Sequence, residues 1–225
     1  GCNNLVINAI DAPELSQVTD MSFMFMNCSN LNQSIDHWDV SNITDMSNLF
    51  YNASSFNQPL NNWDVSSVKD MERVFGQAEV FNQPLNNWNV SSVKNMKYMF
   101  SRAIRFNQPL NEWNVSNVIN MSNMFNNALA FNQPLNNWNT SNVTNMVRMF
   151  AADYSTLGEN SFDQPIGNWD VSNVSLMSGM FNGNINFNQP LNNWNVSNVI
   201  NMNHMFSGVS FARSTFNQPL GNWDV

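Results

Sequence analysis

Acidic and amide side chains recur once per repeat, at a position where they could bind a ligand. Each directly follows a tryptophan, and most are 25 residues apart. On stacked parallel strands, such a column would present carboxylates and amides about 4.8 Å apart. Two interpretations stay open: a concave hydrogen-bonding platform for a glycan or an extended protein, or side-chain ladders that satisfy one another. The column comprises Asp39, Asp64, Asn89, Asn114, Asn139, Asp170 and Asn195.

Two insertions supply further candidate binding residues. The segments Phe150–Phe162 and Phe206–Phe216 are six and four residues longer than the standard gap between these two phenylalanine positions. Because both occur at the same register, we expect them to project from one edge, where repeat proteins often bind partners. Tolerated loop growth is the alternative. The residues concerned are Asp153, Tyr154, Glu159, Phe211 and Arg213.

Two cysteines occupy equivalent positions, Cys2 and Cys28, each in the pattern C-x-x-L. We expect them to be neighbours one coil apart. A disulfide between them would staple the N-terminal cap if the sulfur geometry allows it. Two buried thiols are the other interpretation.

Six of the eight basic residues cluster in two adjacent repeats. On a chain with net charge -8, this patch could meet an acidic partner. A solvated helix face is the simpler interpretation. The cluster comprises Lys69, Arg73, Lys94, Lys97, Arg102 and Arg105.

Catalytic chemistry has little support. His37 and His204 lie in different columns, and neither has a serine, cysteine or carboxylate at motif spacing. No zinc-protease, hydrolase-elbow or phosphate-loop motif occurs. Asp39 and Asp64 could adjoin, but no calcium-loop pattern accompanies them. The sequence therefore predicts a protein that is not an enzyme, with no cofactor and no metal site.

Charge and hydropathy exclude other classes. An excess of acidic over basic residues, 16 against 8, argues against a nucleic-acid partner. No apolar run approaches the roughly 18 residues of a membrane span.

A repeat of about 25 residues organises the whole chain. The eight tryptophans are separated by 25, 25, 25, 25, 31, 25 and 29 residues. A fixed period of this length indicates a solenoid or array, in which stacked units bury one continuous core. We predict that the Trp, Val, Met and Phe columns form that core rather than sugar-stacking or metal sites.

Two apolar patterns within each repeat suggest its elements. Alternation over Trp63–Val65 predicts a short strand, and the spacing over Val68–Ala78 predicts one face of a short helix. The fold class expected is therefore α/β: a right-handed leucine-rich-repeat-like solenoid, with one short parallel strand and one short helix per coil. Residues 1–30 are predicted to be a capping unit and 31–225 a single solenoid. We expect the solenoid to continue past Val225, or to self-associate through its open C-terminal edge.

The segments W-D-V-S-N-I-T-D-M-S-N-L-F (Trp38–Phe50) and F-N-Q-P-L-N-N-W-D-V (Phe56–Val65) identify a resemblance. They resemble the repeats of bacterial surface proteins of the mycoplasma-lipoprotein and listerial types, allied to BspA-like leucine-rich repeats. The resemblance covers almost the whole chain. It implies a non-enzymatic, extracellular, cell-surface protein, and says less about mechanism.

The expected function is a cell-surface scaffold for adhesion or protein–protein interaction. Its partner would be an unknown protein or glycan on a host or neighbouring cell. A glycan-binding module is one alternative, and a structural stalk or virion-surface component is another.

Overall fold

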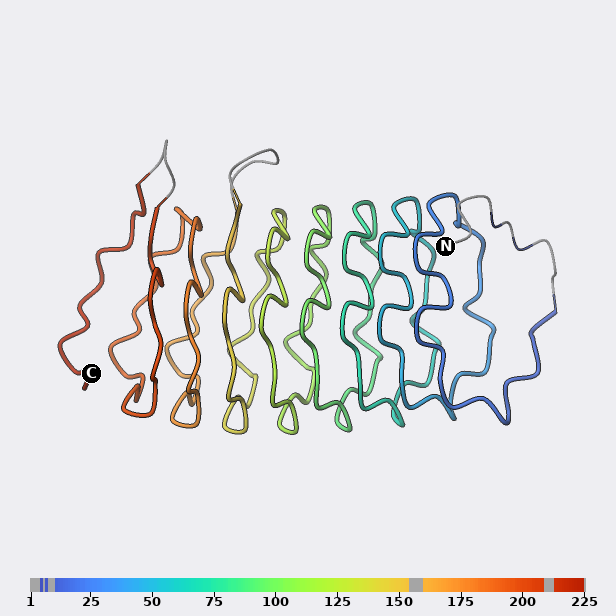
Figure 1. Cartoon of the computed structure of the whole chain (residues 1–225), viewed down its shortest axis with the longest axis horizontal. Coiled ribbons are helices and arrows are strands. Elements are labelled where there is room, and N and C mark those ends of the chain that lie inside the picture. The colour runs from blue at the N-terminus through green and yellow to red at the C-terminus, as the bar shows by residue number, and fades with distance from the viewer. Residues whose placement is uncertain (1–4, 6, 8–10, 154–159, 209–212, 225) are drawn as a thin grey trace.

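The chain forms a row of stacked coils. The computed structural model describes residues 5, 7, 11–153, 160–208 and 213–224. Figure 1 shows the coils side by side along one axis, in chain order from blue to red. Equivalent positions in neighbouring coils are mostly 25 residues apart, so each repeat makes one coil.

Regular secondary structure is almost absent from these coils. Across the described residues there is no helix, and strand pairing is limited to one isolated parallel bridge between each pair of neighbouring coils. The bridges are Asp20 with Asp45, Asp45 with Asp70, Asp70 with Asn95, Asn95 with Asn120, Asn120 with Asn145, Asn145 with Leu176, and Leu176 with Asn201.

The predicted α/β leucine-rich-repeat-like solenoid is therefore wrong. The segment 68–78, expected to be a helix, consists of turns and extended links. The segment 63–65, expected to be a strand, carries no bridge, because the pairing falls at Asp70 instead. The leucine-rich-repeat assignment fails with it, since that architecture needs a strand and a helical connection in each coil.

Each coil is instead a chain of β-turns closed by hydrogen bonds from residue i+3 to residue i. In one coil the turns are Met46–Leu49, Asn48–Tyr51, Phe50–Ala53, Ala53–Phe56, Leu60–Trp63 and Val65–Val68, with N···O distances of 3.0–3.1 Å. Because a β-turn brings its first and fourth residues close together, inward side chains recur every three residues. This spacing imitates a helix face, which explains the misassignment.

Three of these turns form the most regular part of the coil, which we call the turn ladder. It comprises residues 20–28, 45–53, 70–78, 95–103, 120–128, 145–152, 176–184 and 201–207. Alternate N–H groups of each rung donate to the next coil: Asn48 to Glu72 O at 2.7 Å and Phe50 to Val74 O at 2.9 Å. A helix would keep these bonds within its own segment, whereas here they join the coils.

Left-handed backbone recurs twice in six of the eight rungs and once in the other two, and it sets the turn type. Asn48 and Asn52 have φ of 58°, and Gly179 and Gly183 occupy the equivalent positions at 60° and 72°. Each is the third residue of its turn, where a type II turn requires positive φ and therefore favours glycine or asparagine. Some rungs place larger residues there, including Arg102 at 59°.

Arg102 offers a test that separates a turn from a helix. We expect Arg102→Gly to be more stable than Arg102→Ala by about 1 kcal/mol, because a Cβ is strained in left-handed backbone. In a helix interior, alanine would instead be favoured over glycine by about 1 kcal/mol. Urea unfolding of the two variants measures the sign, and greater stability of the alanine variant would contradict the turn ladder.

Stacked aromatic side chains fill the interior. Phe75 is fully buried; its ring centroid lies 5.6 Å from that of Phe100 in the next coil and 4.0 Å from that of Phe81 in its own. Trp88 and Trp113 stack at 6.5 Å with an interplanar angle of 4°. Every tryptophan except Trp223, which is half-buried, is at most 7% exposed. The prediction that the Trp, Val, Met and Phe columns form the core is confirmed.

Several recurring sets of side-chain hydrogen bonds hold the rest of the coil to its neighbour, and two of them involve the tryptophans and the F-N-Q segment. The indole Nε1 of Trp88 donates to Leu60 O of the preceding coil at 2.8 Å, and six other tryptophans do the same at 2.9–3.1 Å. In the F-N-Q segment, Asn82 Oδ1 accepts the Asn107 N–H at 2.9 Å and Gln108 Nε2 at 3.0 Å. We call the acceptors of this second set the Asn ladder: Asn32, Asn57, Asn82, Asn107, Asn132, Asp163 and Asn188.

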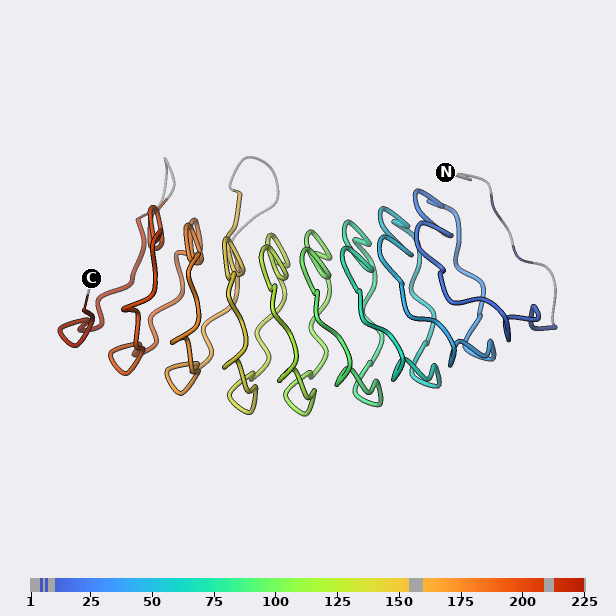
Figure 2. The same ribbon diagram turned by 60° about the horizontal axis from the view of Figure 1, so that its bottom comes forward.

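The coils fan apart toward one edge, as Figure 2 shows. Phenylalanine rings of successive turn-ladder rungs lie 5.5–5.9 Å apart, whereas successive tryptophan rings lie 6.1–6.5 Å apart. Backbone hydrogen bonds draw the turn ladder together, and the bulky indoles hold the other side open. None of the described residues belongs to a helix long and apolar enough to cross a bilayer.

Candidate functional site

The polar column that follows the tryptophans is built from local turns. Asp39 Oδ1 accepts the Ser41 N–H at 3.0 Å and the Ser41 hydroxyl at 2.7 Å. Asp64 Oδ1 likewise accepts the Ser66 N–H at 3.0 Å. Each member caps its own coil two residues on, so the structure shows turn caps where the sequence suggested a side-chain ladder. The column also adjoins the tryptophans, where coil spacing is wide, which is opposite to the spacing expected on a concave surface. Its role in binding stays a prediction.

These caps lower the pKa of the aspartates in the column. The Ser41 hydroxyl and the Ser41 N–H both stabilise the charged carboxylate, so the pKa of Asp39 lies below its usual value. Ser66 and Ser172 lower the pKa of Asp64 and Asp170 in the same way. A depressed pKa in the folded state adds stability above the unfolded pKa of about 3.9, and that stability is lost as pH falls through the folded value.

Removing the Ser41 hydroxyl tests this cap. We expect Ser41→Ala to raise the pKa of Asp39 partway toward its ordinary value, because the backbone N–H still donates. Carboxyl ¹³C chemical shifts followed from pH 2 to 6 measure the midpoint. The pKa of Asp64 in the next coil serves as the internal control. An unchanged Asp39 midpoint would show that the hydroxyl does not stabilise the carboxylate.

The insertions and the cysteines are described only in part. Asp153 accepts the Asn127 amide at 3.0 Å and pairs with Arg148, and Arg213 is exposed. Tyr154, Glu159 and Phe211 lie outside the described residues. Cys28 is buried and forms no disulfide with any described residue. Because Cys2 also lies outside the described residues, the disulfide stays a prediction.

A cavity of about 690 Å³ runs along the outer face of the turn ladder across five coils. We call it the outer groove. Its floor consists of small or amide residues that are themselves buried, namely Gly76, Ser101, Asn123 and Asn126. Longer, more exposed side chains rise around them, namely Tyr51, Arg73, Gln77, Tyr98, Arg102 and Arg148.

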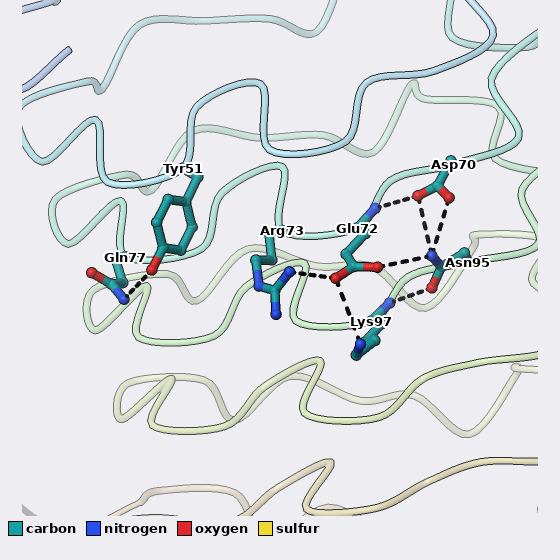
Figure 3. A network of polar contacts seen from close by, with 7 residues as sticks. All are labelled: Tyr51, Asp70, Glu72, Arg73, Gln77, Asn95 and Lys97. Carbon is teal, nitrogen blue, oxygen red and sulfur yellow. Dashed lines mark hydrogen bonds and ion pairs between the residues drawn. The ribbon is translucent and has the colours of Figure 1, made fainter. Parts of the chain in front are cut away.

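Small floor residues create the hollow. Tyr51, Gly76 and Ser101 stand at one equivalent position of successive coils, so a large side chain is followed by two small ones. A Cβ on Gly76 would lie 3.0 Å from Tyr51 Cδ2, which shows that the ring leans over the glycine. The Tyr51 hydroxyl accepts Gln77 Nε2 at 2.6 Å, which fixes the ring at the end of the groove (Figure 3).

A network of charged groups lies beside the groove (Figure 3). Glu72 Oε1 lies 2.5 Å from Arg73 Nη1 and 3.7 Å from Lys97 Nζ, so one carboxylate serves two cations. Both cations also lie over the Tyr98 ring, at 4.5 Å and 5.4 Å from its centroid. Cation–π attraction and the shared carboxylate therefore hold these long side chains in place.

Two buried polar side chains on the floor have no hydrogen-bond partner among the residues that the structure describes. Asn123 is 7% exposed and Ser101 is 8% exposed. Neither the Asn123 amide nor the Ser101 hydroxyl forms a hydrogen bond with any described residue, although Asn126 beside them donates to Ala151 O at 3.3 Å. Buried polar groups are normally hydrogen-bonded, so the floor presents donors and acceptors that a bound molecule could satisfy.

Groups that could support catalysis do not converge among the described residues. No cluster of three or more His, Cys, Asp or Glu side chains that could hold a metal occurs there. His204 Nδ1 lies 3.2 Å from Ser207 Oγ, in an exposed position, and no carboxylate of a described residue pairs with the ring. His37 is exposed as well.

The basic cluster predicted from sequence contributes Arg73 and Arg102 to the outer groove, and Lys97 to the charged network beside it. The sequence prediction did not include Tyr51 or Asn123. The signal was present, because both tyrosines of the groove replace smaller or polar residues of the repeat.

Comparison with known families identifies the family of the chain. The profile of a family described as a Mycoplasma protein of unknown function, DUF285, matches residues 1–103, 62–158 and 156–225. Searches of curated proteins and of solved structures gave no match. The matches agree with the mycoplasma-type resemblance of the repeats, whereas no kinship with BspA-like leucine-rich repeats emerges. With three overlapping matches from the first residue to the last, the chain belongs to the DUF285 family of mycoplasma proteins.

Proposed function

We propose that this chain is a non-enzymatic repeat scaffold displayed outside the cell, and that it attaches to a partner through the outer groove. The observation that carries the proposal is the groove floor. There the buried polar groups of Asn123 and Ser101 lie among tyrosine and arginine side chains and form no hydrogen bond within the described part of the chain. Elsewhere in the coil, many amide side chains are used in cross-coil bonds or turn caps, as those of Asn107 and Asn114 are.

The repeat architecture supports a scaffold rather than a reaction centre. Its inter-coil contacts are made by the same residues in successive coils, and the variation between copies concentrates on the outer side of the turn ladder. Repeat proteins commonly use such extended surfaces for binding. Display outside the cell is supported by the resemblance of the repeats to those of bacterial surface proteins.

Attachment of protein-coated beads to host-cell monolayers and to extracellular matrix tests the proposal. The groove variant is Tyr98→Asn/Arg102→Asn/Asn123→Gly. Equivalent positions already hold Asn48, Asn127 and Gly179 with positive φ, so these residues suit the backbone. The control, Lys94→Thr/Arg105→Ser, removes two charges outside the groove and uses residues found at equivalent positions, Thr144 and Ser55.

We expect the groove variant to lose most attachment and the control to keep it. The proposal fails if the native chain does not attach at all. It also fails if the groove variant attaches as well as the native chain while its unfolding midpoint is unchanged.

A further inference from the structure

We propose that the ligand of the outer groove is an acidic oligosaccharide, a sugar chain that carries carboxylate or sulfate groups. The inference rests on the proposed function, because it takes the groove to be the attachment surface. It adds the chemistry of the partner, read from the hydrogen-bonding capacity, the charge and the aromatic walls of the groove.

The floor matches a hydroxyl-rich ligand. The Asn123 side chain offers an NH₂ donor and a carbonyl acceptor, and the Ser101 hydroxyl can do both. A sugar hydroxyl also donates and accepts, so neighbouring hydroxyls can satisfy these buried groups together. A purely apolar ligand would leave them unpartnered, at a cost of about 1–3 kcal/mol each. The cavity volume of about 690 Å³ lies within the range of small-ligand sites, about 300–1,000 Å³.

The charge of the groove selects an anion. Three arginines and one carboxylate, that of Asp153, line it, on a chain whose net charge is -8. Arg148 pairs with Asp153, and Arg73 pairs with Glu72. Arg102 forms no ion pair with any described residue. Its guanidinium fork can therefore bind a carboxylate or sulfate without breaking an existing contact.

Tyrosines supply the third feature of a sugar site. Tyr51 and Tyr98 are half-buried at one end and one side of the groove. Tyrosine gives a large, rigid contact area at low conformational-entropy cost, together with a polar hydroxyl. Both side chains are already held, Tyr51 by Gln77 and Tyr98 by its two cations, so little order has to be gained on binding.

An acidic peptide fits the groove less well. An extended peptide that binds by strand addition forms main-chain hydrogen bonds with a free sheet edge. Here the backbone of the groove is already occupied: Arg73 N donates to Lys97 O, Tyr98 N to Ser122 O, and Asn123 N to Val147 O, at 2.8–3.0 Å. Recognition must therefore come from side chains, as expected for a ligand with many hydroxyls.

Calorimetric titration of the folded chain with four probes tests the inference. The probes are a hyaluronan hexasaccharide with carboxylates only, a heparin-derived hexasaccharide with sulfates as well, neutral chitohexaose, and a hexaglutamate peptide. We expect at least one acidic sugar to bind ten or more times tighter than both chitohexaose and hexaglutamate. The two acidic arms distinguish carboxylate from sulfate recognition. Binding should weaken as salt rises, because ions screen the arginines.

Variants with opposite signs make the test sharper. Arg102→Asn and Asn123→Gly should each weaken binding of the acidic sugar about tenfold. Glu72→Gln should strengthen it severalfold, because Arg73 and Lys97 lose their shared carboxylate. Arg105→Ser, which removes one charge outside the groove, should have no effect. NMR shifts of the Asn123 side-chain NH₂ on titration locate the ligand.

Three outcomes would overturn the inference: equal binding of hexaglutamate, equal binding of chitohexaose, or no binding of either acidic sugar. If the groove variant still abolishes cell attachment in any of these cases, the scaffold function stands and only the ligand class is wrong. If the groove variant also attaches as well as the native chain, both the scaffold function and the ligand class are wrong.

Discussion

Phe100→Ala should lower the free energy of unfolding by about 3–5 kcal/mol, the range for removing a buried aromatic side chain. Phe100 is fully buried in the middle of the row, and its ring stacks on Phe75 and Phe125 at 5.6 Å. It also lies 4.1 Å from Phe106 within its own coil. Its loss therefore opens a cavity shared by three coils, which their closed turns have little freedom to fill.

Urea unfolding, followed by tryptophan fluorescence, measures this change. Hydrogen exchange shows which part of the chain is destabilised, and we expect amide protection to fall most in the rungs 70–78, 95–103 and 120–128. Phe23→Ala is the matched control, because Phe23 is 55% exposed and should change stability by less than about 0.5 kcal/mol. If Phe100→Ala changed the free energy of unfolding as little as Phe23→Ala, the stacked rings would not be what stabilises the core.

The interior could be predicted from the sequence because the period is so regular. Once coils stack at a fixed repeat, residues at equivalent positions must lie in columns, whatever the backbone between them. The positions of Trp63, Met71 and Phe75 carry no charged or polar residue in any repeat, and all three residues are buried. The column argument needs only the repeat, so it survives the error in secondary structure.

The backbone itself could not be predicted in the same way. Inward residues three apart arise from a helix and from consecutive β-turns alike. The deciding information lay in the positions between them, where Asn48, Asn52, Gly179 and Gly183 recur at four-residue spacing. Asparagine and glycine are poor helix residues but suit positive φ. Arg102 and Tyr98 at the same positions hide that signal.

The outer groove was only partly predictable for a related reason. Basic residues of adjacent repeats are visible in the sequence, but a cavity depends on which columns face outward together. In the structure, the column that contains Gly76 and Ser101 lies between the columns of Tyr98 and Arg102. A helix over Val68–Ala78 would not place these three columns side by side, so it does not predict the groove. That the Asn123 amide forms no hydrogen bond with any described residue depends on three-dimensional contacts, which no sequence pattern predicts.

Asn107→Ala is expected to destabilise the stack by about 1–3 kcal/mol, the range for leaving partly buried donors unpaired. Asn107 Oδ1 accepts both the Asn132 N–H and Gln133 Nε2, each at 3.0 Å. No bridge joins the coils at this segment, so the Asn ladder replaces strand pairing there. Alanine removes the acceptor and provides nothing in its place, and the difference in urea unfolding free energy measures the loss.

The chain itself offers the control, since Asp163 stands at the same position of the ladder. Its carboxylate accepts the Asn188 N–H at 2.9 Å and Gln189 Nε2 at 3.0 Å. Asn107→Asp keeps both acceptor contacts and should stay within about 0.5 kcal/mol of the native chain near neutral pH. Below its pKa the introduced carboxyl group is protonated and becomes a weaker acceptor, so the aspartate variant should lose stability in acid. The native asparagine does not titrate, so the native chain should lose no stability at this site. Equal destabilisation by alanine and aspartate at pH 7 would show that the side-chain acceptor is not what joins these coils.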